Sequence, residues 1–266
     1  MENVWLDELK RDKTLSLDDV ERSMRYAKDL TRGLATIKTY PQGVTVFGSA
    51  RLGADNEFYK KAYELGAKLA RSGHPVITGG GPGIMEAANR GAFENHGRSI
   101  GLNIHLDTEQ DLNKYTTDSM EFHYFFARKV MLTFSAKVYV FFPGGFGTMD
   151  EFAEVLELVH TAKVPPAPLF LFGGEFWRGL DEWFAGPMSA MKLIETGAAG
   201  ELNEIRPDEP RAADHGLVKN ARELYKITDD VDAIVAAADA AASRDVTEAI
   251  ADITARDSRD YQGKVF

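Results

Sequence analysis

One short glycine-rich segment contains the residues of this chain best suited to chemistry, and it runs Pro143-Gly144-Gly145-Phe146-Gly147-Thr148-Met149-Asp150-Glu151. It follows the apolar run 138–142 and precedes apolar positions at helical spacing, which predicts a buried strand, a glycine turn and the start of a helix. Backbone N–H groups at such a turn suit a phosphate. Because Glu151 adds a carboxylate in the predicted first turn, the segment indicates chemistry on a nucleotide in addition to phosphate binding.

A second glycine turn lies earlier in the chain. The predicted strand 74–78 is followed by Gly79-Gly80-Gly81-Pro82-Gly83 and then by a helical pattern that contains Glu86. Neither turn completes the dinucleotide-binding pattern, because the third glycine position holds Glu86 in one turn and Asp150 in the other. Neither turn is a P-loop, since no Gly-Lys-Ser/Thr follows at the required spacing. The two turns therefore disfavour a NAD-dependent oxidoreductase or an ATPase.

Both candidate carboxylates also have a purely structural explanation. The stretch from Thr148 to Glu151 matches the capping box S/T-x-x-E, in which Glu151 caps the helix. Glu86 lies early in the other predicted helix, where an acidic side chain interacts favourably with the helix N-terminus. The alternative for Glu86 is a hydrogen bond to the ligand. The sequence alone leaves both pairs of alternatives open.

The remaining candidates are a serine, a basic pair and a histidine. Ser49 follows a predicted strand and a glycine, so its hydroxyl could contact a phosphate or a ribose, or simply complete a turn. Arg128 and Lys129 fit an ordinary solvated basic pair, whereas a contact from Arg128 to phosphate or ribose is the alternative. His123 is predicted to be a packed or surface histidine. Because no HxxxH or clustered Asp/His pattern is present, we expect no metal.

Alternating strands and helices must position these residues. Apolar runs and helical periodicity predict strands at 43–47, 74–78, 100–104, 138–142, 169–172 and 225–228, and helices that include 16–38, 127–136 and 231–242. The alternation predicts a Rossmann-like α/β fold, an open parallel sheet with helices on both faces. Ligands bind such sheets at the carboxyl ends of the strands, so both glycine turns are expected to line one cleft.

The predicted organisation is a single nucleotide-binding catalytic domain at 41–242. A helical N-terminal extension at 1–40 and a charged C-terminal tail at 243–266 flank it. Residues 105–117 and 196–218 are predicted to be loops, and the aromatic segment 122–126 receives no assignment.

Composition narrows the function classes. The 266 residues carry a net charge of −10, which repels polyanions and argues against nucleic acid as the main partner. No cysteine is present, which excludes disulfides, thiolate metal sites and a cysteine nucleophile. No apolar run approaches the roughly 20 residues of a membrane span, and residues 1–10 lack a signal-peptide pattern. We therefore expect a cytoplasmic protein that acts on neither membranes nor nucleic acid.

The two glycine turns, the Arg128-Lys129 pair and the pattern PGGxGTxxE ending at Glu151 occur in order, and together they resemble the LOG ("lonely guy") family of cytokinin riboside 5′-monophosphate phosphoribohydrolases. The resemblance covers about residues 42–195. It implies hydrolysis of the N-glycosidic bond of a nucleoside 5′-monophosphate, a cytokinin nucleotide or AMP, to free base and ribose 5-phosphate. It implies no cofactor. Many relatives carry the label "lysine decarboxylase", but that reaction needs a pyridoxal phosphate site that the sequence does not offer.

By similarity, Arg128 and Glu151 are the expected catalytic pair. The residues expected around the nucleotide are Ser49, Gly80, Gly81, Glu86, Lys129, Gly144, Gly145, Gly147 and Thr148. The long terminal segments resemble the longer bacterial branch, for which we expect a homo-oligomer, a dimer or a dimer-based hexamer. A non-catalytic nucleotide-binding protein, or one that carries a molybdenum cofactor, is the alternative on the same fold. The enzyme is favoured because a plain binder needs the glycine turns but not the Arg128–Glu151 pair.

Overall fold

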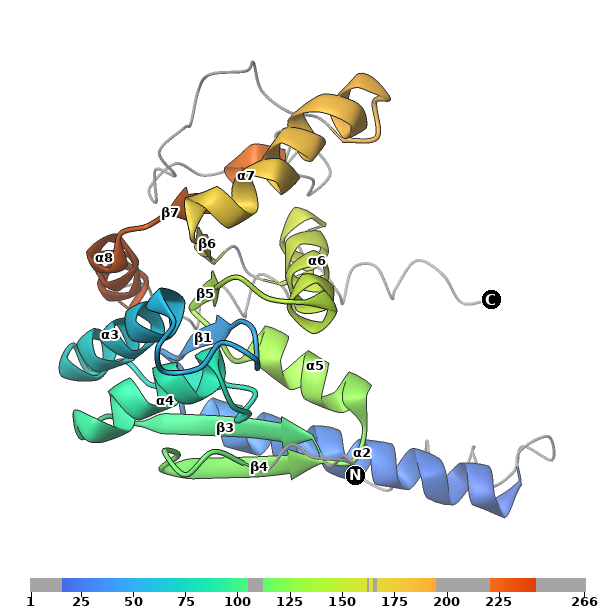
Figure 1. Cartoon of the computed structure of the whole chain (residues 1–266). Helices are drawn as coiled ribbons and strands as arrows, with labels where there is room; N and C mark the ends of the chain where they lie inside the picture. Colours follow the sequence, from blue (N-terminus) through green and yellow to red (C-terminus); the bar gives the residue numbers. More distant parts are fainter. Residues whose placement is uncertain (1–15, 105–111, 162, 165–166, 195–220, 243–266) are drawn as a thin grey trace.

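A seven-stranded parallel sheet forms the centre of the protein (Figure 1). The computed structural model describes residues 16–104, 112–161, 163–164, 167–194 and 221–242. The strands lie in the order β4-β3-β2-β1-β5-β6-β7, and every neighbouring pair is parallel. Their bounds are β1 Val44–Phe47, β2 Val76–Thr78, β3 Ser99–Ile104, β4 Asp118–Phe122, β5 Val138–Phe141, β6 Leu169–Phe172 and β7 Lys226–Thr228. The predicted Rossmann-like α/β fold is confirmed.

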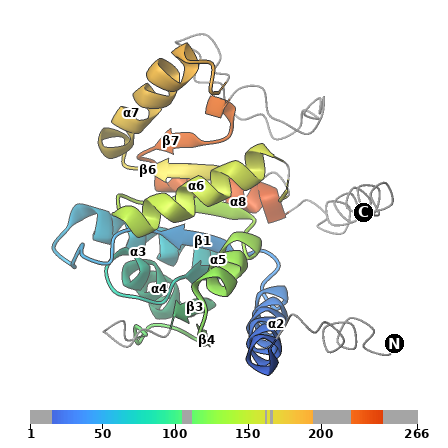
Figure 2. The same ribbon diagram turned by 90° about the vertical axis from the view of Figure 1, so that its right-hand side faces the viewer.

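Helices cover both faces of this sheet (Figure 2). On one face, α3, α4 and α8 pack against a core that includes Leu65, Ala88 and Ile234. On the other face, α2, α5, α6 and α7 bury side chains such as Met131 and Phe152. The helices are α2 Leu17–Lys38, α3 Glu57–Arg71, α4 Ile84–Glu94, α5 Phe125–Phe134, α6 Phe146–His160, α7 Gly174–Trp183 and α8 Val231–Ala242, with a π-helical turn Phe184–Met188 after α7 and a 3₁₀ turn Ala221–Glu223 before β7.

The central strands are buried on both sides, as the apolar runs predict. Every residue of β1 and β5 is buried, and the two strands pair in register from Val44 opposite Val138 to Phe47 opposite Phe141. Phe47 and Phe141 stack with ring centroids 4.5 Å apart on one face of the sheet. Because side chains alternate along a strand, the valines of β1 and β5 point to the other face of the sheet and fill the core there.

The order of the strands fixes where a ligand fits. From β1 the chain moves outward through β2, β3 and β4, and it then returns to β5 on the other side of β1. The connections after β1 and β5 therefore run in opposite directions from the middle of the sheet. A crevice forms at the carboxyl ends of the strands at such a reversal, and ligands of open α/β sheets bind there.

The helix predicted at 16–38 is present, but its buried face differs from the predicted one. Ser16 caps α2 with a capping box that includes Asp19. The apolar stripe of the sequence predicts that Val20, Met24, Ala27, Leu30 and Leu34 face the core, yet Met24 and Leu34 are exposed and the other three are half-buried. The buried positions are Asp29, Gly33 and Ile37, because a glycine lets the side chain of Met131 on α5 lie against the helix backbone.

One strand escaped the sequence analysis. Residues 105–117 are predicted to be a loop and 122–126 have no assignment, whereas the structure has β4 at Asp118–Phe122 beside β3. The strand lies at the edge of the sheet, and only Met120 and Phe122 of its five side chains are buried. Its one-sided alternation is the signal that the apolar-run criterion missed.

Several predicted segments lie outside the described residues. These are 1–15, residues 105–111 of the predicted 105–117 loop, the whole 196–218 loop and the 243–266 tail, so the division into 1–40, 41–242 and 243–266 stays a prediction. Within the described part of the chain, no helix combines the length and the hydropathy needed to cross a membrane.

Candidate active site

Three connections meet at the carboxyl ends of the central strands. The glycine turn 79–83 follows β2, the turn 143–145 follows β5, and Ser49 follows β1 between them. The Ser49 N–H donates to the carbonyl of Pro143 at 3.0 Å, and the Ile84 N–H donates to the carbonyl of Ser49 at 3.0 Å. The backbone of Ser49 thus joins both glycine turns, as expected for turns that line one cleft. Its hydroxyl accepts from the Arg51 N–H at 3.1 Å, which completes a turn.

The first glycine turn has a backbone that requires glycine. Gly80 and Gly83 have φ values of +72° and +70°, where a side chain is strained. A Cβ atom on Gly83 would also overlap the carbonyl of Ser49. The turn is therefore shaped by its own conformation and by close contact with the end of β1.

Two buried asparagines, which the sequence analysis did not single out, hold this turn. The Asn113 side-chain amide donates to the carbonyls of Gly80 and Gly81, each at 3.1 Å, and to Asn89 Oδ1 at 2.9 Å. Asn89 in turn accepts from the Thr78 hydroxyl at 2.6 Å. Because these bonds draw the turn's carbonyls inward, its shape is fixed by side chains distant in sequence. A polar residue amid the buried alanines of α4 was the available signal for Asn89.

The second glycine turn starts its helix earlier than predicted. Gly145 is the N-cap of α6, the helix begins at Phe146, and no side chain caps it. Glu151 is the sixth helical residue, so it does not close a capping box, and that interpretation is wrong. Thr148, the third residue, is buried with its hydroxyl packed against Gly144, where a Cβ atom would overlap it.

Two glycines of the second glycine turn could be replaced by a residue with a side chain without a clash inside the protein. Gly145 and Gly147 are exposed, and a Cβ atom on either would meet nothing within 4 Å. Neither has a positive φ. The N–H groups of the first helical turn have no partner within the helix, and Phe146 and Gly147 in that turn are exposed. The turn therefore offers an accessible anion-binding helix N-terminus.

Arg128 is buried, so the solvated-pair interpretation is wrong for this residue. Its Nε donates to the carbonyl of Leu102 on β3 at 2.7 Å, and its Nη2 donates to the carbonyl of Gly79 at 3.3 Å. Its Nη1 lies 4.0 Å from Oε1 of Glu151. The guanidinium thus connects α5, β3, the first glycine turn and α6.

Burial raises the pKa of Glu151 to about 7, while the nearby Arg128 guanidinium opposes this increase. Burial also lowers the pKa of Arg128, and Glu151 counteracts that change. An arginine keeps its charge in proteins, so the pair consists of a permanent cation and a carboxylate that titrates near neutral pH. A carboxylate of this kind is suited to general base or electrostatic catalysis.

The other two predicted side chains make contacts within the protein. Lys129 Nζ lies 2.8 Å from Asp150 Oδ2 and 3.3 Å from Glu154 Oε2, so it bridges α5 to α6. Glu86 is half-buried in the first turn of α4 and accepts a hydrogen bond from the Tyr59 hydroxyl at 2.9 Å. The assignment of these residues, and of Ser49 and the glycines, to nucleotide binding stays a prediction.

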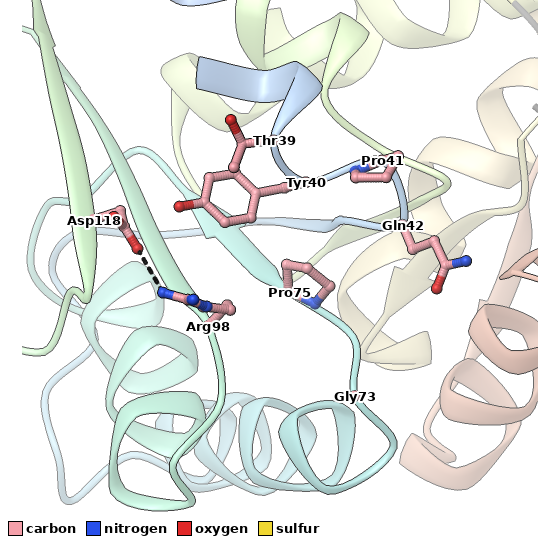
Figure 3. Close-up of a pocket in the computed structure, with 8 residues that line it drawn as sticks. All are labelled: Thr39, Tyr40, Pro41, Gln42, Gly73, Pro75, Arg98 and Asp118. Atoms are coloured by element: carbon pink, nitrogen blue, oxygen red, sulfur yellow. Dashed lines mark ion pairs between the residues drawn. The ribbon is translucent and has the colours of Figure 1, made fainter. Parts of the chain in front are cut away.

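A separate pocket of about 440 Å³ lies at the amino ends of the strands, opposite the candidate site (Figure 3). Its lining residues come just before β1 to β3 or at the start of β4, and Arg98 lies 3.6 Å from Asp118 across it. Ligands of this fold bind at the carboxyl ends instead, so this pocket does not belong to the candidate site. Among the residues that the structure describes, no group of three or more His, Asp or Glu side chains is placed to hold a metal ion.

Comparison with known proteins adds independent findings. Residues 85–215 match the family described as "Possible lysine decarboxylase". An uncharacterized protein of Archaeoglobus fulgidus is 33% identical over 104 residues, which cover 39% of this chain and 67% of that protein. A cytokinin riboside 5′-monophosphate phosphoribohydrolase of Rhodococcoides fascians is 27% identical over 149 residues, 55% of this chain and 75% of the relative. Among solved structures, the molybdenum cofactor carrier protein of Chlamydomonas reinhardtii aligns with a TM-score of 0.49 and 21% identity over 76% of this chain and 98% of its own.

Proposed function

Because the chain belongs to the LOG family, we propose that it hydrolyses the N-glycosidic bond of nucleoside 5′-monophosphates. The products would be the free base and ribose 5-phosphate, and the candidate substrates are AMP and cytokinin riboside monophosphates. The observation that carries the proposal is the pair of the buried Arg128 and the largely buried Glu151, whose side chain is 19% exposed, with Nη1 and Oε1 4.0 Å apart beside two glycine turns.

The pair suits the charge that this reaction develops. Breaking the bond between C1′ and the base nitrogen builds positive charge on the ribose. A largely buried carboxylate at Glu151 stabilises that charge and orients the water that attacks C1′. Water adds its hydroxyl to C1′, and its proton passes to the departing base. The products are ribose 5-phosphate and the free base. Arg128, held by two backbone carbonyls, keeps the carboxylate in place.

The glycine turns suit the phosphate. The exposed first turn of α6 presents backbone N–H groups together with the favourable end of the helix dipole. Gly145 and Gly147 leave space that no protein atom fills, which supports close approach of a ligand to the backbone. Phosphate bound there anchors the nucleotide, and its binding energy orients the ribose against Glu151.

A substrate panel tests the proposal. The purified protein is incubated with AMP, GMP, CMP, UMP and isopentenyladenosine monophosphate, and free base and ribose 5-phosphate are quantified by chromatography. We expect base release from at least one monophosphate and much slower release from the matching nucleoside without phosphate. Equal turnover of AMP and adenosine would contradict the phosphate anchor. Nucleotide binding without any base release would contradict the hydrolase and favour a carrier or binding protein.

We also propose that the protein forms a homo-oligomer. Phe125, Phe126 and Phe134 on α5 and Met24 and Leu34 on α2 are all at least 42% exposed, and the two helices pack against each other. Exposed apolar surface of this kind marks sites of protein–protein interaction. A second copy of the chain would cover it. Size-exclusion chromatography with light scattering tests this, and a monomer at micromolar concentration would contradict it. The cytoplasmic location stays a prediction.

A further inference from the structure

Lys129 follows Arg128 in sequence, yet its ammonium group contacts different partners. It lies 2.8 Å from Asp150 and 3.3 Å from Glu154, two carboxylates one turn apart on α6. Glu151 lies between them on the same helix and faces Arg128. Two consecutive residues of α5 thus contact α6 at neighbouring points, one at the reactive carboxylate and one at the carboxylates that flank it.

We infer that Lys129 is a positioning residue that acts on Glu151 through Asp150 and Glu154, and that it does not bind the substrate phosphate. This inference rests on the proposed function, because it assigns Lys129 a role in setting the state of the proposed catalytic carboxylate. The geometry points to this role because the ammonium group of Lys129 is already paired with two carboxylates. The side chains of Lys129 and Glu154 are only 23% and 31% exposed, so solvent screens this ion pair less than one at an open surface.

The charges around Glu151 show why the ion pairs of Lys129 with Asp150 and Glu154 matter. Within the described residues, Arg128 and Lys129 on α5 favour its ionised form, whereas Asp150 and Glu154 on its own helix oppose that form. Leu102 and Gly79, which also contact Arg128, contribute only uncharged backbone groups. Without Lys129, one cation would remain against two flanking anions, and ionisation of the largely buried Glu151 would become harder.

The bridge also orients the helix that carries Arg128. Neighbouring residues of a helix point about 100° apart, so contacts from both Arg128 and Lys129 to α6 fix the rotation of α5 about its axis. Arg128 then keeps its guanidinium between the carbonyl of Gly79 and the Glu151 carboxylate. Loss of the Lys129 contacts would loosen this orientation as well as change the charge balance.

The test compares pH–rate profiles of kcat/KM for AMP, or for the best monophosphate of the panel, in the wild type and in Lys129→Met. We expect the acidic limb of the profile to move up by about one pH unit in Lys129→Met. Activity at pH 6 should then fall about tenfold, whereas activity above pH 8.5 should return to within about threefold of wild type. A triple variant that adds Asp150→Asn and Glu154→Gln removes the flanking anions, and its limb should return to the wild-type position or to a lower pH.

Lys68→Met is the matched control. Lys68 also bridges two carboxylates, Glu64 at 2.9 Å and Asp232 at 2.7 Å, and it has a similar side-chain exposure of 29%. It lies on α3, on the other face of the sheet, so its removal should leave the profile unchanged. Lys129→Arg keeps the charge and should preserve most of the profile.

Three results would overturn the inference. One is a loss in Lys129→Met that is equal at every pH, which indicates packing alone. Another is a rise in KM for AMP without a shift of the limb, which indicates a phosphate contact. The third uses proteins carrying ¹³C-labelled glutamate carboxyls, with Glu151→Gln to assign the resonance. There, an unchanged Glu151 titration in Lys129→Met would contradict the inference even if the wild type has no activity, whereas a shifted titration with an inactive wild type would refute the proposed function alone.

Discussion

The Arg128 guanidinium lies directly over Gly79. Its Nη2 is 3.3 Å from the carbonyl oxygen of that glycine, and a Cβ atom on Gly79 would overlap the same nitrogen. Because Gly79 has no side chain, the Arg128 guanidinium can lie against its backbone and next to Glu151. The first glycine turn serves two purposes in this arrangement, because it lines the cleft of the candidate site and makes room for the buried cation.

Gly79→Ala should displace Arg128 and reduce kcat/KM for the nucleotide by at least about 100-fold, because misplacement of a catalytic group by about 1 Å costs that much. The measurement is steady-state base release, with circular dichroism to verify folding. Gly179→Ala in α7 is the control, since its Cβ atom meets nothing within 4 Å. Full activity of folded Gly79→Ala would show that Arg128 does not need this position.

Gly147→Ala should separate stability from function. Alanine is the better helix former, and the position is open, so the free energy of unfolding should stay the same or rise by up to about 1 kcal/mol. The added methyl group would occupy the space proposed for the phosphate, so we expect KM for AMP to rise at least about tenfold, a binding loss of about 1.4 kcal/mol. Chemical denaturation and steady-state kinetics measure the two effects. An unchanged KM would place the phosphate elsewhere.

Asn113→Ala should loosen the first glycine turn, because the carbonyls of Gly80 and Gly81 lose a buried donor. Leaving such groups unsatisfied costs about 1–3 kcal/mol, and the distorted turn should raise KM for the nucleotide about tenfold or more. Asn95→Ala is the control, since Asn95 also donates to a backbone carbonyl, that of Gly91, at the far end of α4. Equal effects of both substitutions on KM would contradict a specific role for Asn113.

Glu151 should make stability depend on pH. Its folded-state pKa of about 7 lies above the ordinary value of 4.5, so the folded protein binds a proton that the unfolded chain has lost between these values. Stability therefore falls as pH rises from about 4.5 to about 7, by an amount on the order of a few kcal/mol. Urea denaturation from pH 5 to pH 8 measures this. Glu151→Gln should lack this decrease and be more stable than wild type at pH 8, whereas parallel curves for both proteins would contradict it.

Local patterns predicted much of this structure. The apolar run 169–172 and the helical pattern 231–242 correspond to β6 and α8 at the same bounds, and both glycine turns join a strand to a helix at the carboxyl edge of the sheet. These features depend on the period of apolar residues and on glycine conformation, which are properties of a short stretch of chain. The edge strand β4 was missed because its one buried face leaves no continuous apolar run.

The site required contacts that a linear pattern does not contain. The capping box at Thr148 was a correct match to a local rule, but α6 begins at Phe146 because the glycine turn itself supplies the N-cap. Arg128 looked like half of a solvated pair, and its burial follows from the distant carbonyls of Leu102 and Gly79. Asn113 holds a turn more than 30 residues away. Each of these follows from tertiary packing.

The most direct test of the central claim compares base release from AMP at pH 8 by the wild type, Glu151→Gln and Glu157→Gln. Glu157 lies on the same helix as Glu151 but is exposed, so its variant controls for the loss of a carboxylate on α6. We expect adenine and ribose 5-phosphate from wild type and Glu157→Gln, and a loss of at least about 100-fold in folded Glu151→Gln. Equal release by all three proteins would show that Glu151 is not the catalytic carboxylate, and release by none would contradict the hydrolase.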